Sequence, residues 1–101
     1  MIDLYTWPTP NGRKISILLE ELKIPYKVHL IDINNNEQFN NNFSKISPSN
    51  KIPAIVDKKN GESIFETGAI MLYLSNKNNK FCSKKYYWEI MQWFFYQISQ
   101  V

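Results

Sequence analysis

Two short stretches decide the fold of this chain: Asn50-Lys51-Ile52-Pro53-Ala54-Ile55-Val56 and, after a polar turn, Phe65-Glu66-Thr67-Gly68-Ala69-Ile70. Pro53 has no N–H to give to a sheet, so we expect it at the first residue of the strand that continues through the apolar residues behind it. An X-Pro bond can be cis, and a cis bond usually serves a structural purpose. If Ile52–Pro53 is cis, the N–H and C=O of Ile52 face open space and can pair with a peptide-like ligand.

The second stretch contains the start of a helix. Thr67 is a good N-cap residue for a helical run over residues 68–74, where free N–H groups and the positive end of the helix dipole would hold an anion. Glu66 beside it offers a fixed negative charge, which suits an ammonium group. A ligand with an α-amino acid head and a peptide bond matches both stretches, so the sequence predicts a binding site built mainly from backbone groups.

The sequence on either side of these stretches alternates between strand and helix patterns. Strand patterns cover residues 2–5, 26–30, 54–57 and 63–65, and helix patterns cover residues 14–23, 37–45 and 67–75. The pair Asn60-Gly61 is a hairpin turn signal between the last two strands. The order βαβ, connector, ββα predicts a thioredoxin-like α/β domain over residues 1–77.

A polar segment over residues 78–85 is predicted to be a linker, and residues 86–101 are predicted to form a helix. Apolar residues occur around much of this helix: Trp88, Met91, Phe95 and Ile98 form one stripe, and Trp93, Phe94 and Tyr96 lie elsewhere. One small domain cannot cover so much apolar surface. We therefore expect the first helix of a truncated all-helical domain, and a homodimer in which Trp93 and Phe94 make contacts.

The two opening stretches, with Ser47-Pro48-Ser49 before the first of them, resemble the glutathione-binding, thioredoxin-fold half of the cytosolic glutathione S-transferases. The element Thr9-Pro10-Asn11-Gly12 narrows the resemblance to the bacterial Nu class and to Ure2-like glutathione-dependent disulfide-bond oxidoreductases. The resemblance covers residues 1–77 closely and extends into the last helix. It implies glutathione as cosubstrate, no metal, and either disulfide reduction or transfer of the glutathione thiolate to an electrophile.

The resemblance also implies roles for individual residues. Ile52 with Pro53, and Glu66 with Thr67, would bind glutathione, and Gln38 and Lys51 would meet its backbone and its glycyl carboxylate. Catalysis would require the thiolate of glutathione, because the thiolate is the nucleophile. Thr9 and Asn11 are the candidate catalytic donors to the sulfur, since they occupy the loop before the first helix. The alternative is that Thr9 is only a turn residue and Asn11 only the N-cap of that helix.

Composition narrows the function classes. The 101 residues carry a net charge of +3 that gathers on no single element, which argues against nucleic acid as a partner. No apolar run reaches the length of a membrane span and no signal peptide is visible, so we expect a cytoplasmic protein. The single cysteine, Cys82, excludes an internal disulfide. His29 has no clustered ligand partner and is expected to be a surface or satisfied histidine and not a metal ligand, and Tyr5 is expected to belong to the core.

Two further interpretations stay open from the sequence. The chain could be a non-catalytic binding or regulatory module that keeps the scaffold without turnover, or an inactive truncated fragment. The element Thr9-Pro10-Asn11-Gly12 favours an enzyme over a module, because a scaffold would not need it.

Overall fold

A computed structural model describes residues 1–81 and 83–99. The first half contains the strands β1 (Ile2–Thr6) and β2 (Tyr26–Leu30), the helices α1 (Pro10–Glu21) and α2 (Asn41–Ile46), and two 3₁₀ turns, η1 (Ile33–Asn35) and η2 (Glu37–Phe39). The second half contains β3 (Ala54–Asp57), β4 (Glu62–Phe65), α3 (Thr67–Lys77) and α4 (Tyr87–Ser99). The predicted βαβ, connector, ββα order of a thioredoxin-like domain is confirmed.

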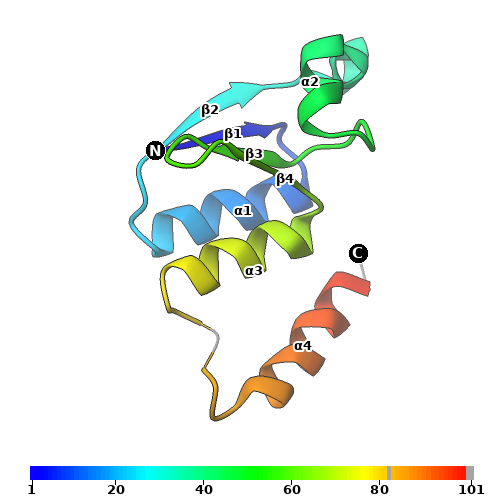
Figure 1. Ribbon diagram of the computed structural model, residues 1–101. Helices are drawn as coiled ribbons and strands as arrows, with labels where there is room; N and C mark the ends of the chain where they lie inside the picture. Colours follow the sequence, from blue (N-terminus) through cyan, green and yellow to red (C-terminus); the bar gives the residue numbers. More distant parts are fainter. Residues whose placement is uncertain (82, 100–101) are drawn as a thin grey trace.

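The four strands form one mixed sheet in the order β2-β1-β3-β4. β1 pairs parallel with β2 and antiparallel with β3, and β3 pairs antiparallel with β4. Figure 1 shows α1 and α3 side by side against one face of this sheet, with α2 at one end on the other side. The core lies between the sheet and these two helices, and its fully buried members are Leu4, Ile15, Leu19, Ile55, Ile70 and Leu74.

Two helix starts differ from the sequence prediction. α1 begins at Pro10 and not at residue 14, because Thr9 caps it and proline is well suited to the first helical position. α3 begins at Thr67 itself, so the prediction that Thr67 is the N-cap is wrong and Glu66 holds that place. Pro53 lies one residue before β3, where its missing N–H costs the ladder nothing.

The helix predicted over residues 37–45 divides into η2 and α2. Asn40, with φ of −62° and ψ of 140°, is extended and separates the two segments. As a result, the two phenylalanines of the segment have different environments: Phe43 is buried, whereas Phe39 is 61% exposed.

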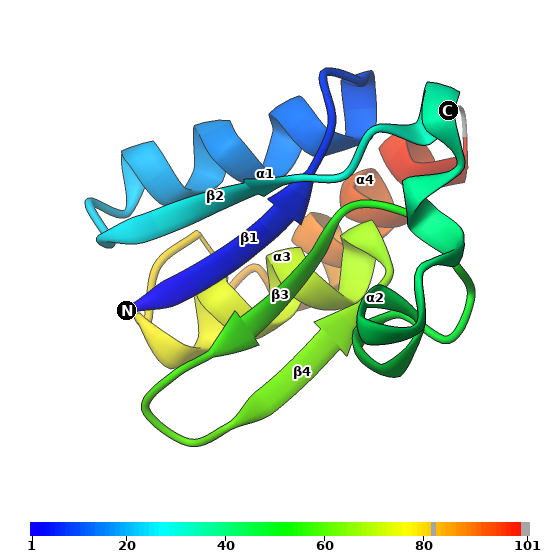
Figure 2. The same ribbon diagram turned by 90° about the horizontal axis from the view of Figure 1, so that it is seen from above.

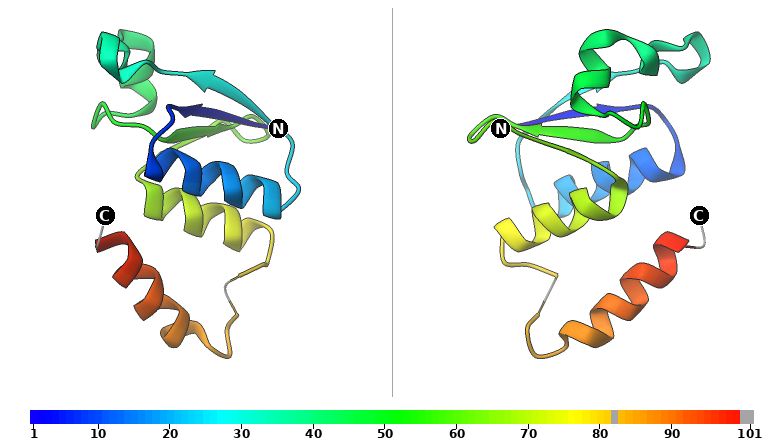
Figure 3. Two further views of the ribbon diagram at one scale, coloured as in Figure 1. Left: turned by 180° about the vertical axis from the view of Figure 1, so that it is seen from behind. Right: turned by 45° about the vertical axis from the view of Figure 1, so that its right-hand side comes forward.

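α4 lies beneath α1 and α3 (Figures 1 and 3) and contacts them through only part of the predicted stripe, namely Met91 and Ile98. Met91 is buried, whereas Trp88 and Phe95 from the predicted stripe are 79% and 57% exposed. Gly68 lets the end of α4 approach α3, because a Cβ there would lie 2.8 Å from Cδ1 of Ile98. Cys82 and Val101, for which the sequence made predictions, lie outside the described residues.

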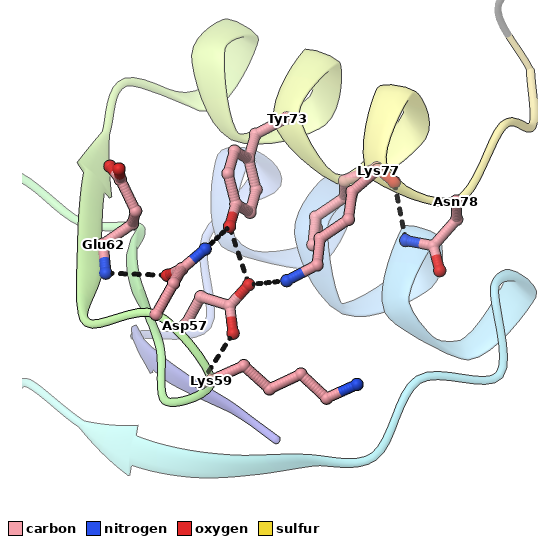
Figure 4. Close-up of polar contacts among 8 residues, drawn as sticks. Asp57, Lys59, Glu62, Tyr73, Lys77 and Asn78 are labelled. Atoms are coloured by element: carbon pink, nitrogen blue, oxygen red, sulfur yellow. Dashed lines mark hydrogen bonds and ion pairs between the residues drawn. The ribbon is translucent and has the colours of Figure 1, made fainter.

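A buried polar cluster fastens the β3–β4 hairpin to α3 (Figure 4). Asp57 is 1% exposed and accepts hydrogen bonds from Tyr73 Oη at 2.7 Å, from the Lys59 N–H at 3.0 Å and from Lys77 Nζ. Asn60 in the turn donates to Tyr73 Oη at 3.0 Å. Burial alone would raise the pKa of Asp57, but the bonds from Lys77, Tyr73 and Lys59 outweigh it and hold this pKa at about 2.

Candidate functional site

Ala54 lies at the centre of the candidate site because it pairs with two strands at once. The register places it opposite Tyr5 in β1 and opposite Phe65 in β4. The residues after Tyr5, the residues before Ala54 and the residues after Phe65 therefore leave the sheet at the same end. Figure 2 shows the start of α1, the α2 region and the start of α3 gathered at this end. The sheet register thus brings together three loops that are far apart in the sequence.

Ile52 supplies the first set of free backbone groups. The Ile52–Pro53 peptide bond is cis, as the sequence suggested. Within residues 1–81 and 83–99, neither the N–H nor the C=O of Ile52 makes a hydrogen bond. Both groups can therefore pair with an extended peptide that lies along this edge. Lys51, immediately before, is exposed, while its C=O accepts a bond of 2.9 Å from the hydroxyl of Ser47.

The start of α3 supplies the second set. Glu66 has φ of 77° and ψ of 121°, a conformation rare for any residue but glycine, and its exposed side chain makes no capping bond. The first bond of the helix runs from the Ile70 N–H to the Glu66 C=O at 3.0 Å. The N–H groups of Thr67, Gly68 and Ala69 have no partner in the described part of the chain. An uncapped helix start of this kind favours an anion.

The start of α1 holds the two predicted catalytic residues. Thr9 Oγ1 accepts a hydrogen bond of 3.1 Å from the Gly12 N–H, so Thr9 is the N-cap and the alternative role of Asn11 as N-cap is wrong. A hydroxyl that accepts one bond still has its own proton to donate. Asn11 lies half-buried in the first turn, and its side chain makes no hydrogen bond to the described residues. Both side chains thus keep donors available at the positive end of α1.

Gln38 lies on η2, and its Oε1 is buried without a partner in the described residues. A buried acceptor left unpaired costs about 1–3 kcal/mol, so a donor from a ligand would be favourable there. The backbone C=O of Gln38 accepts a bond of 2.9 Å from Asn50 Nδ2. No role of Asn50 was predicted from the sequence. The available signal was an asparagine two residues before Ile52, since this residue type tolerates the left-handed conformation that the structure shows there, with φ of 57°.

His29 and Tyr5 lie opposite each other on β2 and β1 and form a stacked pair of rings. His29 Nε2 lies 3.1 Å from Asp3 Oδ1, and its ring stacks on Tyr5 with centroids 4.5 Å apart. The expectation of a satisfied histidine is confirmed. Tyr5 is half-buried, and burial with the nearby Asp3 charge raises its pKa. No three His, Cys, Asp or Glu side chains gather as a metal site within the described ranges.

Comparisons with known proteins identify the family of the chain. The profile of the family described as "Glutathione S-transferase, N-terminal domain" matches residues 1–76. The disulfide-bond oxidoreductase YfcG of Escherichia coli K12 is 47% identical over 98% of this chain. The disulfide-bond oxidoreductase YghU of the same organism is 37% identical over 94% of it.

Solved structures of glutathione transferases and of Ure2p also align with nearly the whole chain. A glutathione transferase family member from Pseudomonas fluorescens, solved with two glutathione bound, aligns over 97% of this chain and 46% of its own, with a TM-score of 0.89 and 38% identity. Ure2p in complex with glutathione aligns over 97% of this chain and 48% of its own, also with a TM-score of 0.89, at 31% identity. The chain spans about half the length of YfcG. No helix among the described residues is long and apolar enough to cross a membrane.

Proposed function

Since the chain belongs to the glutathione S-transferase family through its N-terminal domain, we propose that it binds glutathione at the sheet end around Ala54. We further propose that, in a complete subunit, the bound glutathione thiolate reduces disulfides. One observation supports the binding best: the unpaired backbone groups of Ile52 and the uncapped start of α3 lie at the same end of one sheet.

Each part of glutathione has a matching group in this proposal. The γ-glutamyl head carries an ammonium group, which pairs with Glu66, and a carboxylate, which accepts from the N–H groups at Thr67 and Gly68. The cysteinyl unit aligns its own N–H and C=O with those of Ile52, next to Pro53. The glycyl end extends toward Lys51 and Gln38, where a positive charge and a buried acceptor are available.

The chemistry begins with the thiol. In the proposal, Thr9 and Asn11 donate hydrogen bonds to the sulfur at the positive end of α1, which stabilises the thiolate over the thiol. The thiolate attacks one sulfur of a disulfide, forms a mixed disulfide and releases the other sulfur as a thiolate, which takes up a proton. A second glutathione thiolate attacks the mixed disulfide. Two glutathione molecules are thereby oxidised to glutathione disulfide, and the substrate disulfide is reduced to two thiols.

This scheme requires no cysteine from the protein. Transfer of the same thiolate to an electrophile would need the same glutathione binding and the same activation of the thiol. It differs from disulfide reduction only in the second substrate. The donors kept free at Thr9 and Asn11 favour either reaction over a binding-only module. We propose that the protein works in the cytoplasm, where glutathione is kept reduced. We also propose that a second subunit or further helices cover the exposed aromatics of α4.

Calorimetric titration with reduced glutathione tests the binding. We expect the wild-type chain to bind, and Glu66→Gln to bind about tenfold more weakly, because it loses a charge-assisted bond worth about 1.5–3 kcal/mol. The matched control is Glu62→Gln on β4, an exposed carboxylate away from the site, which should bind normally. The dipeptide Cys-Gly lacks the γ-glutamyl head and should not distinguish Glu66→Gln from wild type. If the folded wild-type chain fails to bind glutathione, the proposal is wrong.

A further inference from the structure

The side chain of Asn50 links three segments that surround the candidate site. Its Nδ2 donates to the Gln38 C=O on η2 at 2.9 Å and to Ser44 Oγ on α2 at 2.6 Å. Asn50 itself lies in the loop that leads to Lys51 and Ile52. One amide group therefore fastens this loop to both neighbouring segments.

The buried side chain of Ser47 holds the same loop through a hydrogen bond to its backbone. The buried hydroxyl of Ser47 donates to the Lys51 C=O at 2.9 Å, and the Ser47 C=O accepts from the Asn50 N–H at 2.9 Å. The backbone is thus held on both sides of the Asn50–Lys51 peptide. Since Ile52 follows directly, its unpaired N–H and C=O depend on these bonds for their direction.

The backbone of Asn50 is left-handed, with φ of 57°. Glycine is the default residue where only this conformation is required, because it has no Cβ penalty. Asparagine tolerates the conformation and adds a side-chain donor. The position therefore combines a backbone requirement with a side-chain requirement, and the two can be separated by substitution.

We propose that Asn50 is a positioning residue for the ligand: it sets the distance between Gln38 on one side and Lys51 with Ile52 on the other. This inference rests on the proposed function, since the ligand is glutathione. Asn50 acts on affinity and not on the sulfur, because its side-chain bonds join its loop to η2 and α2 and do not reach the start of α1.

Three variants separate the side chain from the backbone. Asn50→Gly keeps the left-handed conformation and removes both bonds. Asn50→Asp keeps the size and removes the two N–H donors. The matched control is Asn36→Gly, because Asn36 has φ of 60°, precedes η2 and makes no side-chain capping bond. Calorimetry with reduced glutathione gives the affinity, ultraviolet titration gives the pKa of the bound thiol, and circular dichroism gives the folded fraction.

We expect both Asn50 variants to bind glutathione about threefold to tenfold more weakly, the loss typical of one or two hydrogen bonds. The pKa of the bound thiol should stay at its wild-type value, and Asn36→Gly should match wild type in both measurements. Wild-type affinity for glutathione in Asn50→Gly would overturn this inference and leave the proposed function standing. So would a loss that disappears after correction for the folded fraction, because Asn50 would then be only structural. Absence of binding by folded wild type would overturn the proposed function, and this inference with it.

Discussion

The hydroxyl of Tyr73 on α3 lies 2.7 Å from Asp57 Oδ2 at the end of β3 and donates a hydrogen bond to it. Lys77, one helical turn later, donates to the same oxygen. The cluster joins the β3–β4 hairpin to α3 at the sheet end opposite the candidate site (Figures 2 and 4). It therefore stabilises the fold without taking part in the proposed chemistry.

Asp57 makes the stability of the domain depend on pH. Its pKa falls from 3.8 in a model peptide to about 2 in the fold, which corresponds to about 2 kcal/mol of unfolding free energy. Because the folded pKa is the lower one, this stability is present above about pH 4 and is lost as the pH falls through 2. Urea unfolding at a series of pH values measures the loss.

Asp57→Asn mimics the protonated carboxyl group. We expect it to lower the unfolding free energy at neutral pH by about 2 kcal/mol and to remove most of the loss between pH 4 and 2. Glu62→Gln on the same hairpin is the control and should change stability by less than about 0.5 kcal/mol. If Asp57→Asn keeps the full acid dependence of wild type, other groups must cause it.

Glu66 should show a conflict between stability and binding. Its φ of 77° is unfavourable for a side chain, and strain of this kind costs about 1–3 kcal/mol. Glu66→Gly should therefore raise the unfolding free energy, by about 1 kcal/mol after the entropy cost of glycine. The same variant should weaken glutathione binding about tenfold, since it loses the carboxylate. Thermal unfolding measures the stability of the variant, and calorimetry on the same sample measures its affinity for glutathione. If Glu66→Gly lowers both the stability and the affinity, the prediction is wrong.

Thr9 has two roles that a pair of variants can test. Thr9→Val removes the cap of α1, which should lower the unfolding free energy by about 1 kcal/mol. It also removes a donor to the sulfur, which should raise the pKa of bound glutathione by about one unit. Thr9→Ser keeps the hydroxyl and should keep both properties. If Thr9→Val changes stability but leaves the thiol pKa at its wild-type value, Thr9 is a cap and the sulfur donor lies elsewhere, with Asn11→Ala as the next variant to titrate.

Exposed aromatics on α4 predict self-association of the isolated chain. Trp88 and Trp93 are 79% and 64% exposed, whereas Phe94, the other contact residue named from the sequence, packs partly against α3. Burial of apolar area contributes about 25 cal/mol per Å², so association that covers these side chains is favourable. Light scattering should show a mass that grows with concentration, and Trp93→Lys should reduce it. Phe39→Lys, an exposed aromatic away from α4, should not. A wild-type monomer at high concentration would contradict this prediction.

The strands and the β3–β4 hairpin could be predicted because their signals are local. Asn60-Gly61 marks the hairpin turn, and the apolar run after Pro53 marks β3. The start of α1 was also visible in the sequence, since a threonine before a proline is a common helix start, but the apolar periodicity began later and determined the prediction.

The remaining features depend on contacts between distant residues. Nothing local indicates that Glu66 adopts φ of 77°, because this conformation is rare for a residue with a side chain. Asp57 finds its partners Tyr73 and Lys77 16 and 20 residues later, after α3 has packed on the sheet. The buried face of α4 likewise depends on which side meets α3, and periodicity could not distinguish among several apolar sides.

Backbone amide signals of the isotope-labelled chain, followed by NMR during titration with reduced glutathione, test the central claim most directly. We predict that the amides of Ile52, Thr67 and Gly68 shift together along one binding curve. The amides around Asp57 and Lys77, at the opposite end of the sheet, should stay in place. Shifts confined to that opposite end or to α4, or no shifts at millimolar glutathione, would contradict the account.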